Sequence, residues 1–413
     1  LRKTVLLNCL PLTANKRQIL NSFFDEYLRV LNLTLEYLPN AKSSTELHHL
    51  TYSNIRKTSF LPSDVVQEAR KDVWAKRKTI KKGFKRCSIR LNKRWFKFFE
   101  TERCTPCFRI TYSPRKSFVI PIKRDNGYNR FKDFLKGGWE TKSICLLNGK
   151  IAVSIEKEYP EPVNDRRYVV GVDIGSTTLA AVTVFDSQTS KVVKQLYFGR
   201  DVAVRQRKYE ERRSKLQHHA DKGSEKAKKY LRRLKRKQRN FVKTRSGQIA
   251  KVIVNLALKY NASIAIEKLR LRATKGEVGK NGRKKINRIP YAQFRDFLKS
   301  NCLKYGVPFQ EVDAYHTSKW CPHCGAVNSG HDSRNYALYR CKKCGMVVNS
   351  DRKASLAIAV KSLLERTSQG LTNSCFVQIS RRRVAVNLLV RPDEGDLSGA
   401  VHLTQPLMES PLR

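Results

Sequence analysis

The stretch YVVGVDIGSTTLAAVTVF, residues 168–185, places a carboxylate inside an apolar strand. Its two runs of apolar residues, several of them β-branched, predict two strands joined at the small and polar Gly175-Ser176-Thr177. Asp173 stands within the first run. Burying a carboxylate costs free energy unless it is paired or ligates a metal ion, so Asp173 is a candidate functional residue.

Two other carboxylates stand at comparable points further along the chain. Glu267 lies inside SIAIEKL, residues 263–269, another strand of apolar character, and Asp351 begins the helical pattern DRKASLAIAVKSLLER, residues 351–366. Singly, each has a structural explanation: Asp351 suits the positive end of a helix dipole, and Glu267 suits an ion pair with a lysine of the basic helices. Together, Asp on a first strand, Glu on a later strand and Asp at a helix start indicate an RNase H-like nuclease site. There, converging carboxylates hold two Mg2+ ions about 3.5–4 Å apart, one activating water and one stabilising the leaving 3′ oxygen.

A strongly basic segment, residues 200–245, separates the first strands from the strand that carries Glu267. It holds 19 Lys and Arg against 5 Asp and Glu, a net charge of +14, and repeats such as EKAKKYLRRLKRKQRNF predict a helical hairpin. A run of charge is usually a solvated face, but here acidic partners are too few to neutralise it along the helices. We interpret it as a nucleic-acid-binding surface, represented by Arg232, Arg233, Lys235 and Arg236.

Two Cys-x-x-Cys-Gly segments predict a zinc ribbon. They read WCPHCG at 320–325 and RCKKCG at 340–345, with sixteen residues between the inner cysteines. Two such turns close a tetrahedral shell of four thiolates with no open position for chemistry, which leaves no place for His323. The predicted ligands of one structural Zn2+ are Cys321, Cys324, Cys341 and Cys344. Four free or redox-active thiols are the alternative, and Cys104 and Cys107, which lack a second pair, are interpreted as core packing.

The first 160 residues predict a β-rich domain with a helical insertion. The short β-forming run KTVLLNCLPL, residues 3–12, is followed by helical spacing to about residue 82 and then by short strands such as SIRLNKRWFKFFE, residues 88–100. A hairpin with Asn148-Gly149 at its turn ends this part. We expect a small β-barrel, with its first strand in 1–13, a helical lobe in 14–85 and the remaining strands in 86–160.

The second half is expected to be an α/β nuclease domain interrupted by the zinc ribbon. PEPVNDRR, residues 160–167, reads as a linker, and the later pattern predicts a helix over 291–305 and a strand over 308–314. The expected parts are a first nuclease segment at 166–317, the ribbon at 318–348, a last nuclease helix at 349–367 and a partly disordered tail at 368–413.

Composition indicates a polyanionic partner. The 413 residues include 84 Lys and Arg against 35 Asp and Glu, a formal charge of +49, which would repel itself unless nucleic acid lay against it. Aromatic residues are spread along the chain, which excludes a disordered basic tail. No apolar run approaches the roughly 18 residues of a membrane span, so no membrane partner is expected. The odd number of cysteines and the basic start, without a hydrophobic signal segment, favour a reducing, cytoplasmic and nucleoid-associated location.

These segments together resemble the TnpB family, the transposon-encoded ancestors of type V CRISPR effectors. The resemblance rests on four stretches in the family's order: VVGVDIGSTTLAAV, SIAIEKLRL, YAQFRDFLKSNCLKYGVPFQEVDAYHTSKWCPHCG and YRCKKCGMVVNSDRKASLAIA. They look like the three RuvC motifs and the interposed zinc ribbon. The family's catalytic carboxylates, which bind Mg2+, fall on Asp173, Glu267 and Asp351. The resemblance implies a guide RNA from the transposon end that pairs with double-stranded target DNA beside a short flanking motif, and cleavage at a single RuvC site.

The chain also departs from the family's pattern. Lys268 stands where the family usually has an acidic residue, and Lys353 stands where it usually has Asn. The metal ligands remain, but these two departures are expected to tune or weaken the cleavage activity. The loop at 274–288 lies where relatives carry a lid over the site, and a solvated connection is the alternative. The N-terminal half resembles the family only in architecture, a β-barrel wedge interrupted by a recognition lobe.

Three other functions compete with this interpretation. A DDE-type transposase has its carboxylates in the order Asp, Asp, Glu, which differs from the order here. An RNA-guided repressor that acts by occupancy would be marked by a lost carboxylate, and none is lost. A compact type V CRISPR effector shares the same motifs, and only the neighbouring DNA separates it from a transposon-encoded nuclease.

Overall fold

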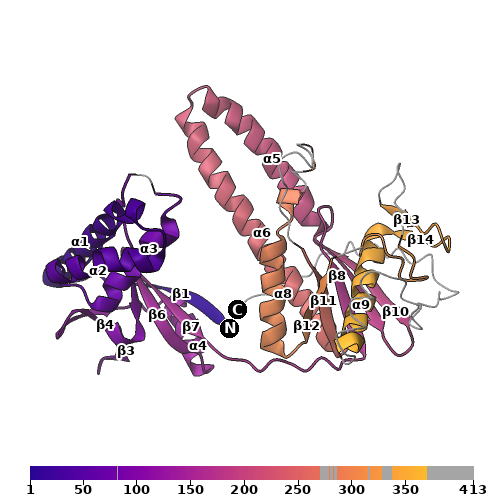
Figure 1. Cartoon of the computed structure of the whole chain (residues 1–413), viewed down its shortest axis with the longest axis horizontal. Helices are drawn as coiled ribbons and strands as arrows, with labels where there is room; N and C mark the ends of the chain where they lie inside the picture. The colour runs from indigo at the N-terminus through magenta and orange to yellow at the C-terminus, as the bar shows by residue number, and fades with distance from the viewer. Residues whose placement is uncertain are drawn as a thin grey trace. The chain divides into compact units, whose positions relative to one another are not determined.

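The computed structural model describes residues 1–80, 82–269, 279, 282, 286–314, 317–327 and 337–369. The chain divides into two compact units, Leu1–Tyr159 and Pro160–Arg413, each with its own hydrophobic core (Figure 1). No helix among the described residues is long and apolar enough to cross a membrane.

Three helices of the first unit form the expected insertion. They are α1 (Ala14–Glu36), α2 (Ser44–Thr58) and α3 (Ser63–Lys76), and α3 packs against the other two. The apolar residues of α1 recur every three to four positions, so Phe23, Tyr27 and Leu31 are buried on one face. Ser43 caps α2 by accepting a hydrogen bond from the backbone N–H of Glu46.

The strands of the first unit form a four-stranded sheet in the order β1-β7-β6-β2 and a three-stranded sheet in the order β3-β4-β5. Their bounds are β1 Arg2–Asn8, β2 Ile89–Asn92, β3 Phe96–Glu100, β4 Pro106–Ser113, β5 Lys116–Pro121, β6 Glu140–Leu147 and β7 Lys150–Glu156. The first strand pairs antiparallel with β7, so the chain enters and leaves this unit side by side. Gly149, with a φ of 69°, makes the turn between β6 and β7.

Three expectations for the first unit need correction. Among its described residues the ladders form two open sheets, linked by an isolated bridge between Cys9 and Ile122, and not a closed barrel. The run at 88–100 is not one strand, because a 3-10 turn at Lys93–Trp95 divides it between the two sheets. A helix, α4 (Asn126–Lys136), was not predicted, although Asp125 caps it through the N–H groups of Gly127 and Tyr128.

The second unit is built on a five-stranded mixed sheet in the order β10-β9-β8-β11-β12. Its strands are β8 Tyr168–Asp173, β9 Ala180–Asp186, β10 Lys191–Phe198, β11 Ala262–Lys268 and β12 Phe309–Asp313. The pairs β10–β9 and β9–β8 are antiparallel, whereas β8, β11 and β12 run parallel to one another. The edge strand β10 was not predicted, because its residues KVVKQLYF show no regular alternation of apolar and polar side chains.

Helices cover both faces of this sheet. On one face, α6 (Glu225–Lys259) and α8 (Tyr291–Tyr305) share a core with Val170 and Val172. On the other, α9 (Ser350–Gln369) packs against Val169 and Phe185. Gly171 admits α9 at close range, since a Cβ there would lie 2.1 Å from the carbonyl oxygen of Ser355.

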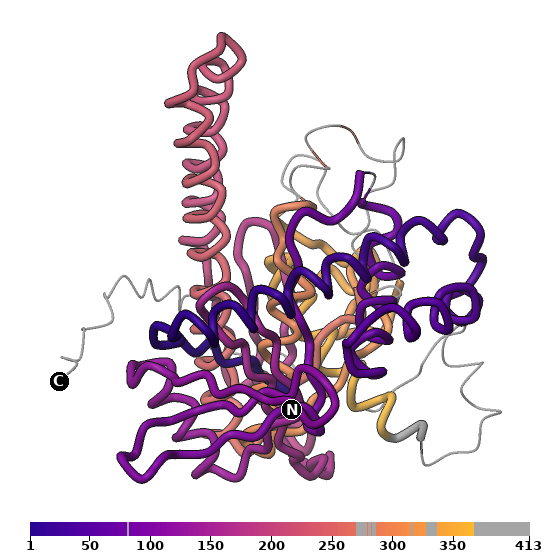
Figure 2. Tube along the Cα trace, turned by 90° about the vertical axis from the view of Figure 1, so that its left-hand side faces the viewer, coloured from indigo at the N-terminus to yellow at the C-terminus, as the bar shows by residue number. Residues whose placement is uncertain are grey.

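The basic segment is a long helical hairpin, formed by α5 (Arg200–Asp221) and α6. Figure 2 shows the two helices running antiparallel, side by side, away from the sheet. The second helix extends beyond residue 245 because its C-terminal half carries the buried Ile249, Ile253 and Val254, which anchor the hairpin in the core.

Candidate active site

The alternation of side chains along two parallel strands brings Asp173 and Glu267 to one face of the sheet. Val169 on β8 and Ala265 on β11 belong to the core beneath α9, and Asp173 and Glu267 follow them by four and two residues. Since side chains alternate with period two, both carboxylates project to the α9 side. The register pairs Val172 with Ile266, so the two carboxylates lie beside one another at the carboxyl ends of their strands.

Asp351 comes to the same place from the first turn of α9. Asn349 caps this helix, because its side-chain oxygen accepts hydrogen bonds from the N–H groups of Asp351 at 3.0 Å and Arg352 at 3.3 Å. Since α9 packs across β8 and β9, the cap sets Asp351 next to the end of β8. The structure therefore places Glu267 and Asp351 near enough to Asp173 for their charges to act on it.

Burial raises the pKa of all three carboxyl groups. Burial raises the pKa of Asp173 to about 8, helped by the negative charges of Glu267 and Asp351. Burial also raises the pKa of Glu267, while hydrogen bonding from the Thr317 side chain opposes that shift. The pKa of Asp351 is raised by burial alone. Buried carboxyl groups that resist ionisation are stabilised in their charged form by a nearby cation, and oxygen ligands suit a hard ion such as Mg2+.

The alternative reading of Glu267, an ion pair with the basic helices, is not what the structure shows. The lysines whose charges act on its carboxylate are Lys353 and Lys361, both on α9. Glu267 is 8% exposed, and its own carbonyl oxygen accepts a hydrogen bond from the hydroxyl of Tyr291. That contact fixes the end of β11 against α8.

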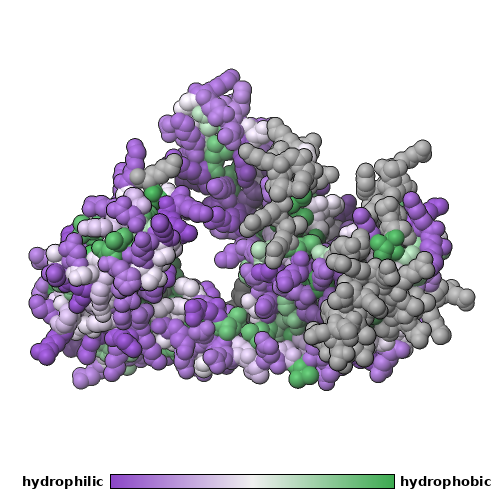
Figure 3. Space-filling model, in the orientation of Figure 1, coloured by the Kyte–Doolittle hydropathy of each residue, from purple (hydrophilic) through white to green (hydrophobic). Residues whose placement is uncertain are grey.

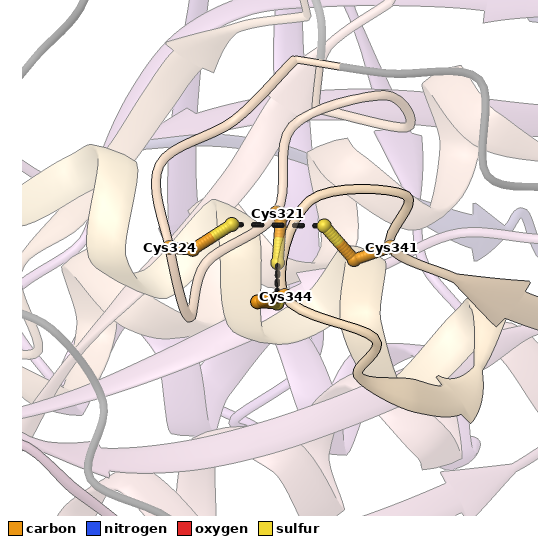
Figure 4. A group of neighbouring side chains, drawn as sticks. All are labelled: Cys321, Cys324, Cys341 and Cys344. Atoms are coloured by element: carbon orange, nitrogen blue, oxygen red, sulfur yellow. Dashed lines mark hydrogen bonds between the residues drawn. The ribbon is translucent and has the colours of Figure 1, made fainter.

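Four cysteines converge on a second centre. Figure 4 shows the side chains of Cys321, Cys324, Cys341 and Cys344 pointing toward one another, and their sulfur atoms all lie within 4.8 Å. Two of the sulfur pairs are 3.8 and 3.6 Å apart. A tetrahedral Zn2+ with bonds of about 2.3 Å places its sulfur ligands roughly 3.8 Å from one another, so the cluster fits zinc.

The two Cys-x-x-Cys turns have the same backbone structure. In each, the first cysteine donates its N–H to the carbonyl five residues ahead, and the glycine four residues ahead donates back to that cysteine. Gly325 and Gly345 both have a φ of 70°, a conformation that favours glycine. The second turn lies between β13 (Leu338–Arg340) and β14 (Val347–Asn349), which pair antiparallel. Among the described residues, Cys104 and Cys107 join no metal-ligand group; Cys107 is buried, as core packing predicts, whereas Cys104 is exposed.

The four basic residues chosen to represent the hairpin are all exposed on α6. Acidic residues of the hairpin are already engaged: Asp201 pairs with Arg245 at 2.8 Å, and Glu225 pairs with Lys228 at 2.6 Å. Figure 3 shows hydrophilic side chains over most of the visible surface of this hairpin. The positive charge of the helices is therefore not neutralised within the hairpin.

The side chains buried around the carboxylates were not predicted from the sequence. Lys353 was noted only as a departure from a family pattern, yet it is 1% exposed and its ammonium donates to the carbonyl of Thr317 at 2.8 Å. A signal was present, because residue 353 shares the helical face of the buried Leu356 and Val360. Most of the proposed lid at 274–288 and nearly all of the tail at 368–413 lie outside the described residues.

Two family models match the chain in succession. The first, described as a probable transposase of the OrfB_IS605 type, covers residues 151–277, and the second, described as a Cas12f1-like TNB domain, covers residues 291–358. Together they span the sheet, the hairpin, the four cysteines and the start of α9.

Curated relatives and a solved structure agree with these matches. The chain is 30% identical over 253 residues to a TnpB-like protein of Aquifex aeolicus, which covers 55% of this chain and 80% of that protein. It is 22% identical to the CRISPR-associated endodeoxyribonuclease Cas12f1 of Sulfoacidibacillus thermotolerans, over 60% of each chain. A solved Cas12f1–sgRNA–target DNA complex has the same fold, with a TM-score of 0.60 and 15% identity over 84% of this chain and 83% of that one. The two family models, the Aquifex relative and the shared fold show that the chain belongs to the TnpB family.

Proposed function

We propose that the protein is an RNA-guided DNA endonuclease with a single RuvC-type site formed by Asp173, Glu267 and Asp351. The observation that carries the proposal is the convergence of these carboxylates from β8, β11 and α9 at one end of the sheet. A guide RNA would pair with one strand of double-stranded DNA beside a short flanking motif, and the site would hydrolyse a phosphodiester bond of the DNA.

The role of the chain's own residues at this site is to bind the metal ions and fix their positions. Asp173 and Glu267 present oxygen atoms from rigid, paired strands, and Asp351 adds a third from a capped helix. Two Mg2+ ions held there would supply Lewis-acid activation of water and stabilise charge on the leaving oxygen. Burial around Asp173 and Glu267 excludes water from one side, which strengthens the attraction between the carboxylates and a cation.

The relatives support DNA as substrate and RNA as guide. The Sulfoacidibacillus relative is named an endodeoxyribonuclease, and the structural neighbour is a complex with sgRNA and target DNA. The charge of +49 suits such partners, because an RNA–DNA heteroduplex is bound through its phosphates without regard to sequence. We assign the exposed basic face of the hairpin, with Arg232, Arg233, Lys235 and Arg236, to this backbone contact.

The resemblance to the family also suggests roles for the remaining parts of the chain. We assign the first unit, with the wedge sheets in 1–13 and 86–160 and the helical recognition lobe in 14–85, to reading the short flanking motif. The zinc ribbon at 318–348 would be a target-nucleic-acid-binding insertion, since its cysteine shell leaves no open position for chemistry. Residues 166–317 and 349–367 would form the nuclease domain.

The proposal is tested with the variants Asp173→Ala, Glu267→Ala and Asp351→Ala. Each should lower Mg2+-dependent cleavage of guide-matched DNA by about a thousandfold or more while guide-RNA affinity stays within about twofold, because these groups hold metal and contribute little to binding. Asp313→Ala is the matched control, since it changes an exposed carboxylate at the same end of the adjacent β12 and should cut at the parental rate. Parental cleavage by Glu267→Ala would remove Glu267 from the site. A parent that binds its guide and target without cutting would favour a repressor.

A further inference from the structure

Lys353 is the most deeply buried charged side chain among the described residues. Its exposed fraction is 1%, and it lies on α9, two residues after Asp351. Taking an ammonium group out of water costs free energy that only nearby polar or negative groups can return. The fold must therefore provide a specific environment for this side chain.

Two contacts of different kinds hold the ammonium group. Its nitrogen donates a hydrogen bond to the carbonyl oxygen of Thr317 at 2.8 Å. It also lies 4.5 Å from the centre of the Tyr339 ring, a distance at which the ring face attracts a cation. Tyr339 is fully buried beside Cys321 and Cys341 in the core of the ribbon. Lys353 thus joins the nuclease helix to the segment that enters the ribbon and to the ribbon itself.

Lys353 also lies between two centres of negative charge. Burial lowers the pKa of Lys353 to about 8, and the negative charges of Cys321, Glu267, Asp173 and Cys341 oppose that shift. Four thiolates around one Zn2+ carry a net charge of −2, and the three carboxylates carry up to −3. A single buried cation between them attracts both.

Thr317 completes the connection to the active site. Its carbonyl oxygen accepts from Lys353, and its hydroxyl donates to the carbonyl oxygen of Ala314 at 3.0 Å. The same side chain lies near enough to Glu267 to lower the pKa of that carboxyl. The residue is itself 2% exposed, so its position depends on these partners. Displacement of the ribbon would move Thr317 and Lys353 together, and with them the surroundings of Glu267.

We propose that Lys353 is a positioning residue that couples the zinc ribbon to the carboxylate site, acting as a counterion shared by the two centres. The inference rests on the proposed function, since it treats the carboxylates as a site for divalent cations. It predicts that the ribbon and the carboxylate site respond to each other, because coupling between two sites is reciprocal.

The ribbon side is tested by zinc release from the purified full-length chain to a chromophoric chelator. Lys353→Met keeps the side-chain length and removes the charge, and it should release zinc about tenfold faster than the parent. Lys361→Met is the matched control: Lys361 lies on the same helix and also donates to a backbone carbonyl, that of Asp313 at 2.6 Å, but its release rate should be parental. Lys353→Arg, which keeps the charge and donors, should retain zinc better than Lys353→Met. Equal release by the Arg and Met variants, or parental release by Lys353→Met, would overturn the proposal.

The carboxylate side is tested by Mn2+ binding to the DNA-free chain, followed by electron paramagnetic resonance. Breaking the ribbon with Cys344→Ser should weaken Mn2+ binding about fivefold or more in the parent, and by less than about twofold when Lys353→Met is already present. The same loss in both backgrounds would overturn the coupling. If Asp173→Ala leaves Mn2+ affinity unchanged, the proposed function fails, because the carboxylates would not be the cation site.

Discussion

At the scale of single residues, the second unit concentrates negative charge where burial opposes it. Asp173 is held near two other carboxylates, and four thiols are held within 4.8 Å of one another. Neither arrangement gains from its own charges, since like charges in a poorly solvated place destabilise each other. Both arrangements become favourable when a cation binds, because the cation neutralises the negative charge.

The zinc centre gives a prediction about composition. We expect one zinc per chain, bound by Cys321, Cys324, Cys341 and Cys344 and measured by elemental analysis. Cys321→Ser combined with Cys341→Ser removes one ligand from each turn and should abolish the zinc, because two thiolates cannot close a tetrahedral shell. The control, Cys104→Ser with Cys107→Ser, alters a pair of the same spacing and should keep the full zinc content. Retention of zinc by the first double variant would contradict the assignment.

At the scale of elements, strand alternation and one helix cap place the carboxylates. The sequence indicated the two strands that carry Asp173 and Glu267, because a carboxylate inside a β-branched run stands out. The burial of Lys353 was less visible, since a lysine on a helix is ordinarily solvated. The predicted β-barrel is not confirmed: alternation predicts strands, but the 3-10 turn at Lys93–Trp95, which divides one predicted strand between two sheets, has no strong signal.

The hairpin gives a prediction about salt. Replacing Arg232, Arg233, Lys235 and Arg236 by Gln should weaken binding of guide RNA or heteroduplex for all sequences and leave the choice of flanking motif unchanged. The dependence of affinity on salt should become shallower, by roughly one power of salt concentration for each phosphate group that the variant no longer binds. Filter binding over a salt series measures this slope.

A control on the same helix sharpens that experiment. Lys251→Gln with Lys259→Gln alters exposed lysines in the C-terminal half of α6, where the helix packs on the sheet, and should leave the slope unchanged. An unchanged slope in the fourfold variant would mean that the hairpin is only a solvated surface.

At the scale of the whole molecule, the chain combines a β-rich unit with a helical insertion and an RNase H-like unit interrupted by a ribbon. Its formal charge of +49 is not explained by the two metal sites, whose ligands are negatively charged. An extended polyanion such as a bound guide RNA would neutralise this positive charge through its phosphate groups. Specificity would then come from base pairing, with the protein reading only a short motif.

The most direct test of this account uses the RNA that copurifies with the protein. The RNA is sequenced, and the complex is incubated with Mg2+ and plasmids that carry the complementary sequence beside a randomised flank. We predict cleavage of the matched plasmid with a short flanking motif enriched among cut molecules, and transfer of cleavage to a new site when the guide sequence is replaced. Cutting that ignores the guide sequence, or the absence of a copurified structured RNA, would contradict RNA-guided cleavage.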